Sequence, residues 1–210
     1  MVVERSFDQL LEHALAMAAV PGRSFLGITG PPGVGKSTLA RRLADALAPA
    51  AVCVSLDGFH IAQIELERTG KASRKGAPDT FDALGYVSLL RRLRDPDAGT
   101  VYAPVFHREI EDSIANELAI HSSVRLIITE GNYLLVRSEP WDQVVSLLDE
   151  VWYLELGEEI RVQRLIARHQ SYGRDLDVAR ARALGPDQRN AELIREYREL
   201  ATLNVMVQRQ

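Results

Sequence analysis

The sequence has one cysteine, Cys53, and no long apolar run among its 210 residues. A single cysteine excludes a disulfide within the chain and a zinc site built from several cysteines. No stretch approaches the ~20 apolar residues that cross a bilayer. The first residues also lack the basic start, apolar core and small-residue cleavage site of a signal peptide. We therefore expect a cytoplasmic protein with no membrane partner.

Lysine is also scarce, and the charge balance is slightly acidic. Lysine occurs only at Lys36, Lys71 and Lys75, so 22 of the 25 basic residues are arginines. Arginine suits bidentate phosphate contacts, although a genome bias toward arginine explains the same count. With 29 acidic residues the formal net charge is −4. Proteins that coat nucleic acid carry a basic excess, so we expect no nucleic-acid partner.

Several apolar runs with little alternation are separated by helical patterns. We predict strands at 24–29, 51–56, 124–129, 151–156 and 203–207, and helices at 6–19, 36–47, 81–94, 158–170 and 186–200. Such strands, joined by helices, indicate a parallel sheet covered on both faces. The prediction is one domain over residues 1–210 with a three-layer α/β/α fold and a mainly parallel, five-stranded sheet. The polar segment 65–80 is predicted to be a long exposed loop, which is commonly functional.

The segment after the first predicted strand, at the start of the next helix, matches the pattern G-x-x-x-x-G-K-[ST]. It consists of Gly30, Pro31, Pro32, Gly33, Val34, Gly35, Lys36 and Ser37, and Thr38 follows. Glycines let successive amides point at phosphate oxygens, and the helix adds its positive end. Lys36 would reach the β- and γ-phosphates, and Ser37 would offer a hydroxyl to Mg²⁺. We therefore predict a P-loop NTPase fold that binds a nucleoside triphosphate together with Mg²⁺.

Three classes of protein share this loop: small-molecule kinases, GTPase switches, and motor or regulatory ATPases. A guanine-reading Asn-Lys-x-Asp sequence is missing, and the D-x-x-G match that begins at Asp82 falls inside a predicted helix. A motor ATPase needs more chain than 210 residues. The favoured prediction is a kinase with ATP and Mg²⁺ as cofactors. A regulatory ATP-binding or ATPase domain with a degenerate acceptor pocket stays open as the alternative.

Two carboxylates follow apolar strands, as a kinase requires. Asp57 ends the strand at 51–56, and Glu130 ends the strand at 124–129. Ligands of open parallel sheets bind beyond the carboxyl ends of the strands, so both side chains should lie near the phosphate loop. One could orient or deprotonate an acceptor hydroxyl while the other holds the magnesium shell. A helix cap or a turn is the alternative role for each.

The predicted helix at 158–170 carries Arg161, Arg164 and Arg168, whose spacing places them on one face. Arg174 follows in a polar segment with a glycine. We predict a lid at about 161–185 in which Arg168 and Arg174 act as catalytic groups over the transferring phosphoryl. A solvated helix face is the alternative.

Several longer segments occur together and in one order. Besides the phosphate loop they are Leu56-Asp57-Gly58-Phe59-His60, Arg74-Lys75-Gly76-Ala77-Pro78-Asp79-Thr80-Phe81-Asp82, Tyr102-Ala103-Pro104-Val105-Phe106-His107-Arg108 and Thr129-Glu130-Gly131-Asn132-Tyr133. From about residue 24 to 194 the chain resembles the uridine kinase, phosphoribulokinase and bacterial pantothenate kinase superfamily. The resemblance is greatest to a pantothenate-kinase-like branch labelled as fructose or sugar kinases.

This resemblance implies a role for each matching residue. Asp57 would be the catalytic base, Glu130 would lie near the metal, and the lid would carry Arg164, Arg168 and Arg174. The acceptor pocket would lie between two loops, about 58–82 and 101–115. The residues implied on the first loop are Phe59, His60, Asp79, Phe81 and Asp82, and those on the second are Tyr102, Phe106, His107 and Arg108.

The acceptor implied is a small polar metabolite with a hydroxyl group: a sugar such as fructose, a nucleoside, or a pantothenate-like alcohol. Each acceptor residue also has a structural alternative. His60 could bond a neighbouring backbone group, Phe81 and Phe106 could belong to the core, and the basic run at 68–75 could be a solvated loop rather than a gate for an anionic acceptor. A homodimer stays open.

Overall fold

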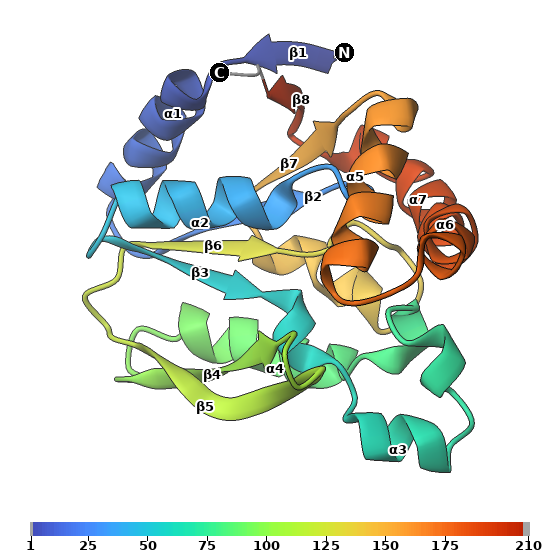
Figure 1. Ribbon diagram of the computed structural model, residues 1–210. Coiled ribbons are helices and arrows are strands. Elements are labelled where there is room, and N and C mark those ends of the chain that lie inside the picture. Colours follow the sequence, from blue (N-terminus) through green and yellow to red (C-terminus); the bar gives the residue numbers. More distant parts are fainter. Residues whose placement is uncertain (1, 208–210) are drawn as a thin grey trace.

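The computed structural model describes residues 2–207, and its centre is a six-stranded sheet (Figure 1). The strands are β1 (Val2–Arg5), β2 (Ser24–Thr29), β3 (Ala51–Ser55), β6 (Leu126–Glu130), β7 (Glu150–Glu155) and β8 (Leu203–Val207). They lie in the order β1-β8-β7-β2-β6-β3, and every neighbouring pair is parallel. The expected parallel sheet is confirmed.

The central strands are apolar without alternation because both faces of the sheet are covered. In β6, Leu126 and Ile128 pack into one buried cluster, whereas Ile127 packs into the cluster on the other face. All three side chains are fully buried. A strand with one solvated face would instead alternate apolar and polar residues. This packing forms the predicted three-layer α/β/α fold.

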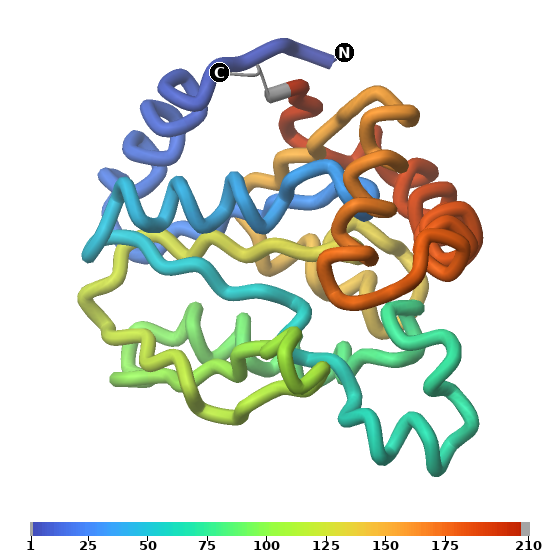
Figure 2. The backbone as a smooth tube through the Cα atoms, viewed as in Figure 1, coloured from blue at the N-terminus to red at the C-terminus, as the bar shows by residue number. Residues whose placement is uncertain are grey.

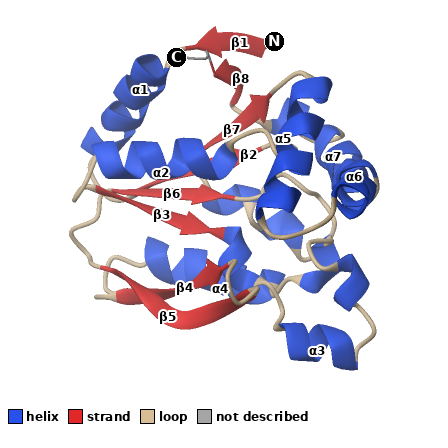
Figure 3. Ribbon diagram, in the orientation of Figure 1, coloured by secondary structure: helices blue, strands red, loops and turns tan. Residues whose placement is uncertain are grey.

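Helices cover both faces of the sheet (Figure 3). They are α1 (Phe7–Ala19), α2 (Lys36–Ala46), α3 (Gln63–Arg68), α4 (Ala83–Arg94), α5 (Glu158–Ser171), α6 (Leu176–Leu184) and α7 (Pro186–Arg195). α1 and α2 pack on one face and α4 on the other. α1 begins with a capping box, in which the side chains of Ser6 and Gln9 accept from each other's backbone amides. None of these helices has the length and apolar character that a membrane crossing requires.

The prediction of five strands was wrong by one, because β1 joins the sheet at its edge. β1 pairs with β8, from Val2 opposite Asn204 to Arg5 opposite Val207. Most of its residues are exposed, including Glu4 and Arg5. An edge strand is paired on one side only and needs no apolar run, so its sequence carries little signal.

Two segments predicted as loops contain regular structure. Residues 101–115 belong largely to an antiparallel hairpin of β4 (Val101–His107) and β5 (Asp112–Ile120), which lies apart from the main sheet. Pro104 inside β4 argues against a strand in sequence terms, and the hairpin register shifts beside it. The segment 65–80 contains the end of α3 and two short 3₁₀ turns, and the helix predicted to reach residue 200 ends at Arg195.

Helices from the last third of the chain lie beside the loop that leads from β2 into α2 (Figure 2). The segment predicted as a lid, 161–185, comprises most of α5 and all of α6. α5 packs directly on the loop: a Cβ atom on Gly33 would lie 2.7 Å from Leu165 Cγ. The fold thus brings α5 to the carboxyl edge of the sheet, where Asp57 and Glu130 also lie.

Candidate active site

The loop between β2 and α2 needs glycine for two separate reasons. Gly30, Gly33 and Gly35 have φ angles of 142°, 83° and 108°, a region that other residues avoid. Space is also missing, because a Cβ atom on Gly30 would lie 2.6 Å from the carbonyl oxygen of Leu154. The backbone therefore curls as a phosphate-binding loop does, and α2 begins at Lys36 directly after it.

Lys36 is buried and folds back over this loop. Its ammonium donates to the carbonyl oxygens of Gly30 at 2.8 Å and Pro31 at 3.1 Å. Burial lowers its pKa to about 8, against the opposing effect of the Glu130 charge. Two carbonyl groups compensate a buried positive charge poorly, so a phosphate oxygen in the loop would be a better partner.

Glu130, at the end of β6, is buried and lies beside two serine hydroxyls. Its Oε1 accepts from Ser55 Oγ at 2.5 Å, and the side chain of Ser37 also bonds it. Burial and then the neighbouring charge of Asp57 raise the pKa of Glu130. The structure therefore places together the two residues that the sequence assigns to a metal.

The donors fit Mg²⁺ bound together with a nucleotide better than a metal held by protein alone. Ser37 and Glu130 supply one hydroxyl and one carboxylate, and residues 2–207 hold no cluster of three or more His, Cys, Asp or Glu suited to a metal. Mg²⁺ commonly takes only one or two protein ligands and fills its shell with phosphate oxygens and water.

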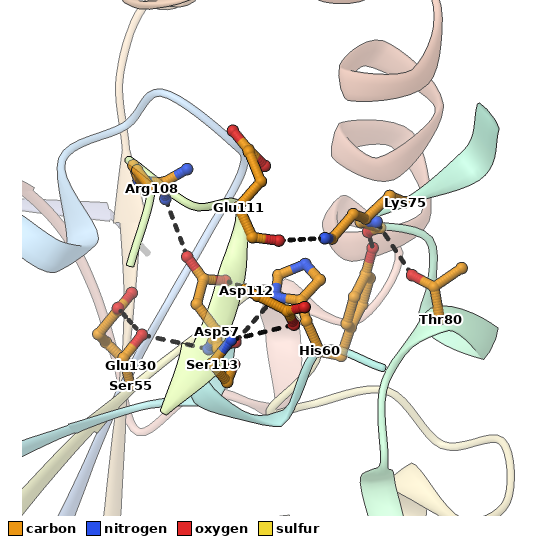
Figure 4. A network of polar contacts seen from close by, with 12 residues as sticks. Ser55, Asp57, His60, Lys75, Thr80, Arg108, Glu111, Asp112, Ser113 and Glu130 are labelled. Atoms are coloured by element: carbon orange, nitrogen blue, oxygen red, sulfur yellow. Dashed lines mark hydrogen bonds and ion pairs between the residues drawn. The ribbon is translucent and has the colours of Figure 1, made fainter. Parts of the chain in front are cut away.

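Asp57 follows β3 in a short 3₁₀ turn, Leu56–Phe59, and is held on two sides (Figure 4). Its amide donates to Ser55 Oγ at 3.2 Å, and its Oδ2 accepts from Arg108 Nη2 at 2.9 Å. The carboxylate is one third exposed. It is thus oriented, yet open to a ligand.

His60 forms a wall beside this carboxylate. Its Nδ1 donates to the carbonyl oxygen of Asp57 at 2.8 Å, since a carbonyl oxygen can only accept. Burial lowers the pKa of His60. The centroid of its ring lies 4.0 Å from that of the Phe81 ring and 4.9 Å from that of the Phe106 ring, and both pairs of rings are tilted. His60 is therefore a neutral, aromatic surface, and it makes the backbone bond named as its structural alternative.

Two clefts meet at the carboxylates. One, of about 1120 Å³, runs along the phosphate loop and is called the nucleotide-side cleft. The other, of about 380 Å³, opens toward α6 and α7 and is called the acceptor-side cleft. The residues that line both are Lys36, Ser37, Asp57, Phe106, Arg108, Glu130, Arg168 and Tyr172. A phosphate in one cleft and a hydroxyl in the other would meet at this boundary.

The arginines of α5 and the following loop do not act alike. Arg168 lines both clefts, Arg174 lines the acceptor-side cleft and Arg164 the nucleotide-side cleft. Arg161 is fully buried and donates to the Pro32 carbonyl oxygen at 3.3 Å. Arg161 therefore supports the phosphate loop structurally and does not face a cleft. The three arginines expected on one face of α5 thus differ in role, because only Arg164 and Arg168 line a cleft.

Of the residues assigned to the acceptor pocket, His60, Phe81, Phe106 and Arg108 line the acceptor-side cleft. His107 lines the nucleotide-side cleft instead and pairs with Glu117 at 2.6 Å.

The other four assigned residues lie away from both clefts in the described chain. Phe59 packs edge-on against Tyr86 in the core, and Asp82 caps α4 by accepting from the Gly85 amide at 2.8 Å. Asp79 pairs with Arg74 at 2.6 Å on the surface, and Tyr102 is 49% exposed on the hairpin. Each therefore has a local structural role or faces solvent.

Several residues of the acceptor-side cleft had no assignment from sequence. They include Glu111, His169, Arg182, Asp187 and Asn190, which come from the hairpin turn, α5, α6 and α7, where no motif marks them. Lys75 also lines this cleft, and it belongs to the basic run 68–75, for which the sequence left open a solvated loop or a gate for an anionic acceptor. Its ammonium donates to the Glu111 carbonyl oxygen at 2.5 Å (Figure 4).

Comparison with known proteins matches this arrangement to one family. The model of the phosphoribulokinase / uridine kinase family matches residues 25–191. A Schizosaccharomyces pombe protein named "Putative uridine kinase" is 32% identical over 173 residues, 78% of this chain and 74% of that protein. The pantothenate kinase of Lacticaseibacillus casei is 30% identical over 176 residues, 80% of this chain and 56% of that protein.

A solved structure agrees over nearly the whole chain. The "putative fructose transport system kinase" of Silicibacter sp. TM1040 has a TM-score of 0.83 and 34% sequence identity, and the match covers 98% of this chain and 100% of that one. The fold described above is therefore similar to the fold of that protein over nearly its full length.

Proposed function

The chain belongs to the phosphoribulokinase / uridine kinase family and is an ATP-dependent small-molecule kinase; from this premise we propose that Asp57 is the base that activates the acceptor hydroxyl. The observation that carries the proposal is the boundary between the two clefts, which Lys36, Asp57, Glu130 and Arg168 all line. Phosphoryl transfer needs an in-line approach and neutralised charge more than covalent chemistry.

At the nucleotide end, the loop amides and Lys36 bind the β- and γ-phosphates. Ser37 and Glu130 hold Mg²⁺, which when bound supplies positive charge to the phosphate oxygens. Arg168 and Arg174 close over the transferring group, and closure excludes water that would otherwise accept the phosphoryl. The hydrogen bond between Ser37 and Glu130 supports this division of roles.

At the acceptor end, the charges favour an alcohol that carries its own negative group. Lys75 and Arg182 line the acceptor-side cleft, and within residues 2–207 neither pairs with a carboxylate. A carboxylate or phosphate on the acceptor would compensate these cations, whereas a neutral sugar or nucleoside would not.

An ATP-consumption assay with matched acceptors tests this function. The pairs are glycerol with glycerate and glycerol 3-phosphate, pantothenol with pantothenate, fructose with fructose 6-phosphate, and uridine with its 5′-phosphate. We expect the anionic member of one pair to stimulate turnover most. Lys75→Met should then raise the KM of that acceptor and leave the KM of ATP unchanged. Greater stimulation by a neutral compound would refute the anionic class but keep the kinase.

The regulatory ATPase is distinguished by the same assay. If the acceptor-side cleft is degenerate, no compound of the panel changes ATP hydrolysis, and only addition of a protein partner does. The acceptor-side cleft is lined by the oriented carboxylate of Asp57 and by the aromatic rings of His60 and Phe106. This lining favours a working acceptor site.

A further inference from the structure

His169 is the middle member of a chain of polar contacts that begins on α7 and ends in the acceptor-side cleft. Its Nε2 lies 2.7 Å from Asp187 Oδ2, and its Nδ1 lies 3.0 Å from Arg174 Nη1. The side chains of His169 and Asp187 are only 11% and 18% exposed. All three residues line the cleft.

The donors and acceptors allow only one direction along this chain. A guanidinium has donors and no acceptor, so Nδ1 of His169 must accept from Arg174. Nε2 then carries the ring proton and donates to the Asp187 carboxylate, which fixes the tautomer. A proton on Nδ1 would place two N–H groups against each other and release Arg174.

The position of Arg174 depends largely on contacts with His169. It follows Gly173, whose φ of 79° turns the chain at the end of α5. The backbone amide of Arg174 also donates to the His169 carbonyl oxygen, at 3.3 Å. In the described part of the chain Arg174 has no ion pair with a carboxylate. His169 therefore holds both its backbone and its guanidinium.

We propose that His169 is a positioning residue, which aims the guanidinium of Arg174 into the acceptor-side cleft while Asp187 sets the tautomer. This rests on the proposed function, in which Arg174 closes on the transferring phosphoryl. Loss of the histidine then lowers the rate of transfer through a misplaced arginine and leaves the binding of ATP largely intact. Misplacement of a catalytic group by about 1 Å can cost ~10²-fold in rate.

The competing interpretation is that His169 merely ties α5 to α7, and two amide substitutions separate the two. In His169→Asn the amide oxygen lies near the position of Nδ1, so it can still accept from Arg174 but does not reach Asp187. In His169→Gln the amide nitrogen lies near the position of Nε2, so the bond to Asp187 survives while the acceptor for Arg174 is lost. If His169 positions Arg174, His169→Asn should have a higher kcat than His169→Gln. If His169 only ties α5 to α7, His169→Gln should have the higher kcat.

We expect His169→Gln to lower kcat at least about tenfold, within the range that misplacement allows, with the KM of ATP changed less than about twofold. His169→Gln combined with Arg174→Ala should be no slower than Arg174→Ala, because the histidine acts through that arginine. His13→Gln, on α1 outside both clefts, is the matched control. The proposal would be overturned if the double variant lost the kcat factors of both single variants multiplied together. It would also be overturned if Arg174→Ala kept the full kcat.

A measurement without turnover keeps this result separate from the proposed function. The ¹⁵N NMR signals of the His169 ring in the intact protein report the tautomer, and we expect Nε2 protonated and Nδ1 bare. The side-chain signal of Arg174 should persist in His169→Asn and broaden in His169→Gln. A ring protonated at Nδ1 would refute the positioning chain even if the kinase activity is confirmed. Conversely, the expected signals with no acceptor-dependent turnover would refute only the function.

Discussion

Arg108 Nη2 and Asp57 Oδ2 lie 2.9 Å apart, although one residue is in the hairpin turn and the other follows β3. The pair stands where the two clefts meet. Arg108 binds one oxygen of the carboxylate, and the other, Oδ1, lies 4.0 Å from His60 Nδ1. Oδ1 is therefore the oxygen that would be left for an acceptor hydroxyl. The hairpin, which belongs to no layer of the main sheet, thereby orients the proposed base.

Asp57→Asn removes the proposed base and keeps the shape of the side chain. We expect kcat to fall by roughly 10²–10⁴, the contribution of a general base, while ATP still binds. Steady-state rates with the best acceptor and ATP binding by calorimetry measure the two effects. Asp8→Asn, on α1, is the control and should keep the wild-type kcat. An unchanged kcat in Asp57→Asn would assign the base to another group.

Arg108→Ala leaves Asp57 in place but free to rotate. We expect kcat to fall about tenfold, less than in Asp57→Asn, because orientation is lost and the base is kept. The double variant should be no slower than Asp57→Asn alone, since Arg108 would act through that carboxylate. Rates of the three variants at one acceptor concentration test this coupling, and a multiplied loss in the double variant would show that Arg108 acts on the phosphates directly.

The buried Lys36 predicts how ATP binding depends on pH. Its pKa is lowered from 10.5 to about 8, and the negative phosphates of ATP favour the charged form. ATP binding should therefore take up protons near pH 8 and weaken as the pH rises above that value. Calorimetry in two buffers of different ionisation enthalpy measures this uptake, and Lys36→Met should bind weakly and lack the pH dependence. Proton release by the wild type would contradict the prediction.

The same shift affects stability in a defined direction. Between pH 8 and 10.5 the unfolded chain holds the Lys36 proton and the folded protein does not. The contribution of Lys36 to the free energy of unfolding therefore rises with pH through this window. Urea unfolding of the wild type and Lys36→Met at pH 7.5 and 9.5 isolates this contribution. If the free energy of unfolding of the wild type fell relative to that of Lys36→Met between pH 7.5 and 9.5, the prediction would be wrong.

Asp82→Ala distinguishes a helix cap from a substrate contact. Asp82 accepts from the Gly85 amide at the start of α4, and loss of an N-cap costs about 1 kcal/mol of stability. We expect a lower midpoint of thermal unfolding and unchanged KM values for ATP and acceptor, with Asp82→Asn close to the wild type because asparagine also caps. A raised acceptor KM at equal stability would return Asp82 to the pocket that its sequence segment implies.

The phosphate loop and the sheet could be predicted from sequence because both follow from neighbouring residues. Gly30, Gly33 and Gly35 set the backbone of the loop within a few residues. Asp57 and Glu130 stand at the ends of parallel strands, and parallel strands end at one edge of a sheet. Their shared location therefore needed only the order of strands and helices.

Contacts between distant segments decided the rest. The pairing of β1 with β8, the bond from Arg108 to Asp57, and the chain from Asp187 through His169 to Arg174 join residues that no local pattern connects. Periodicity records which face of an element is buried, but not which partner lies opposite. Only the packing of the hairpin, α5 and α7 around the sheet selects those partners, because side chains that meet across a cleft need no regular spacing along the chain.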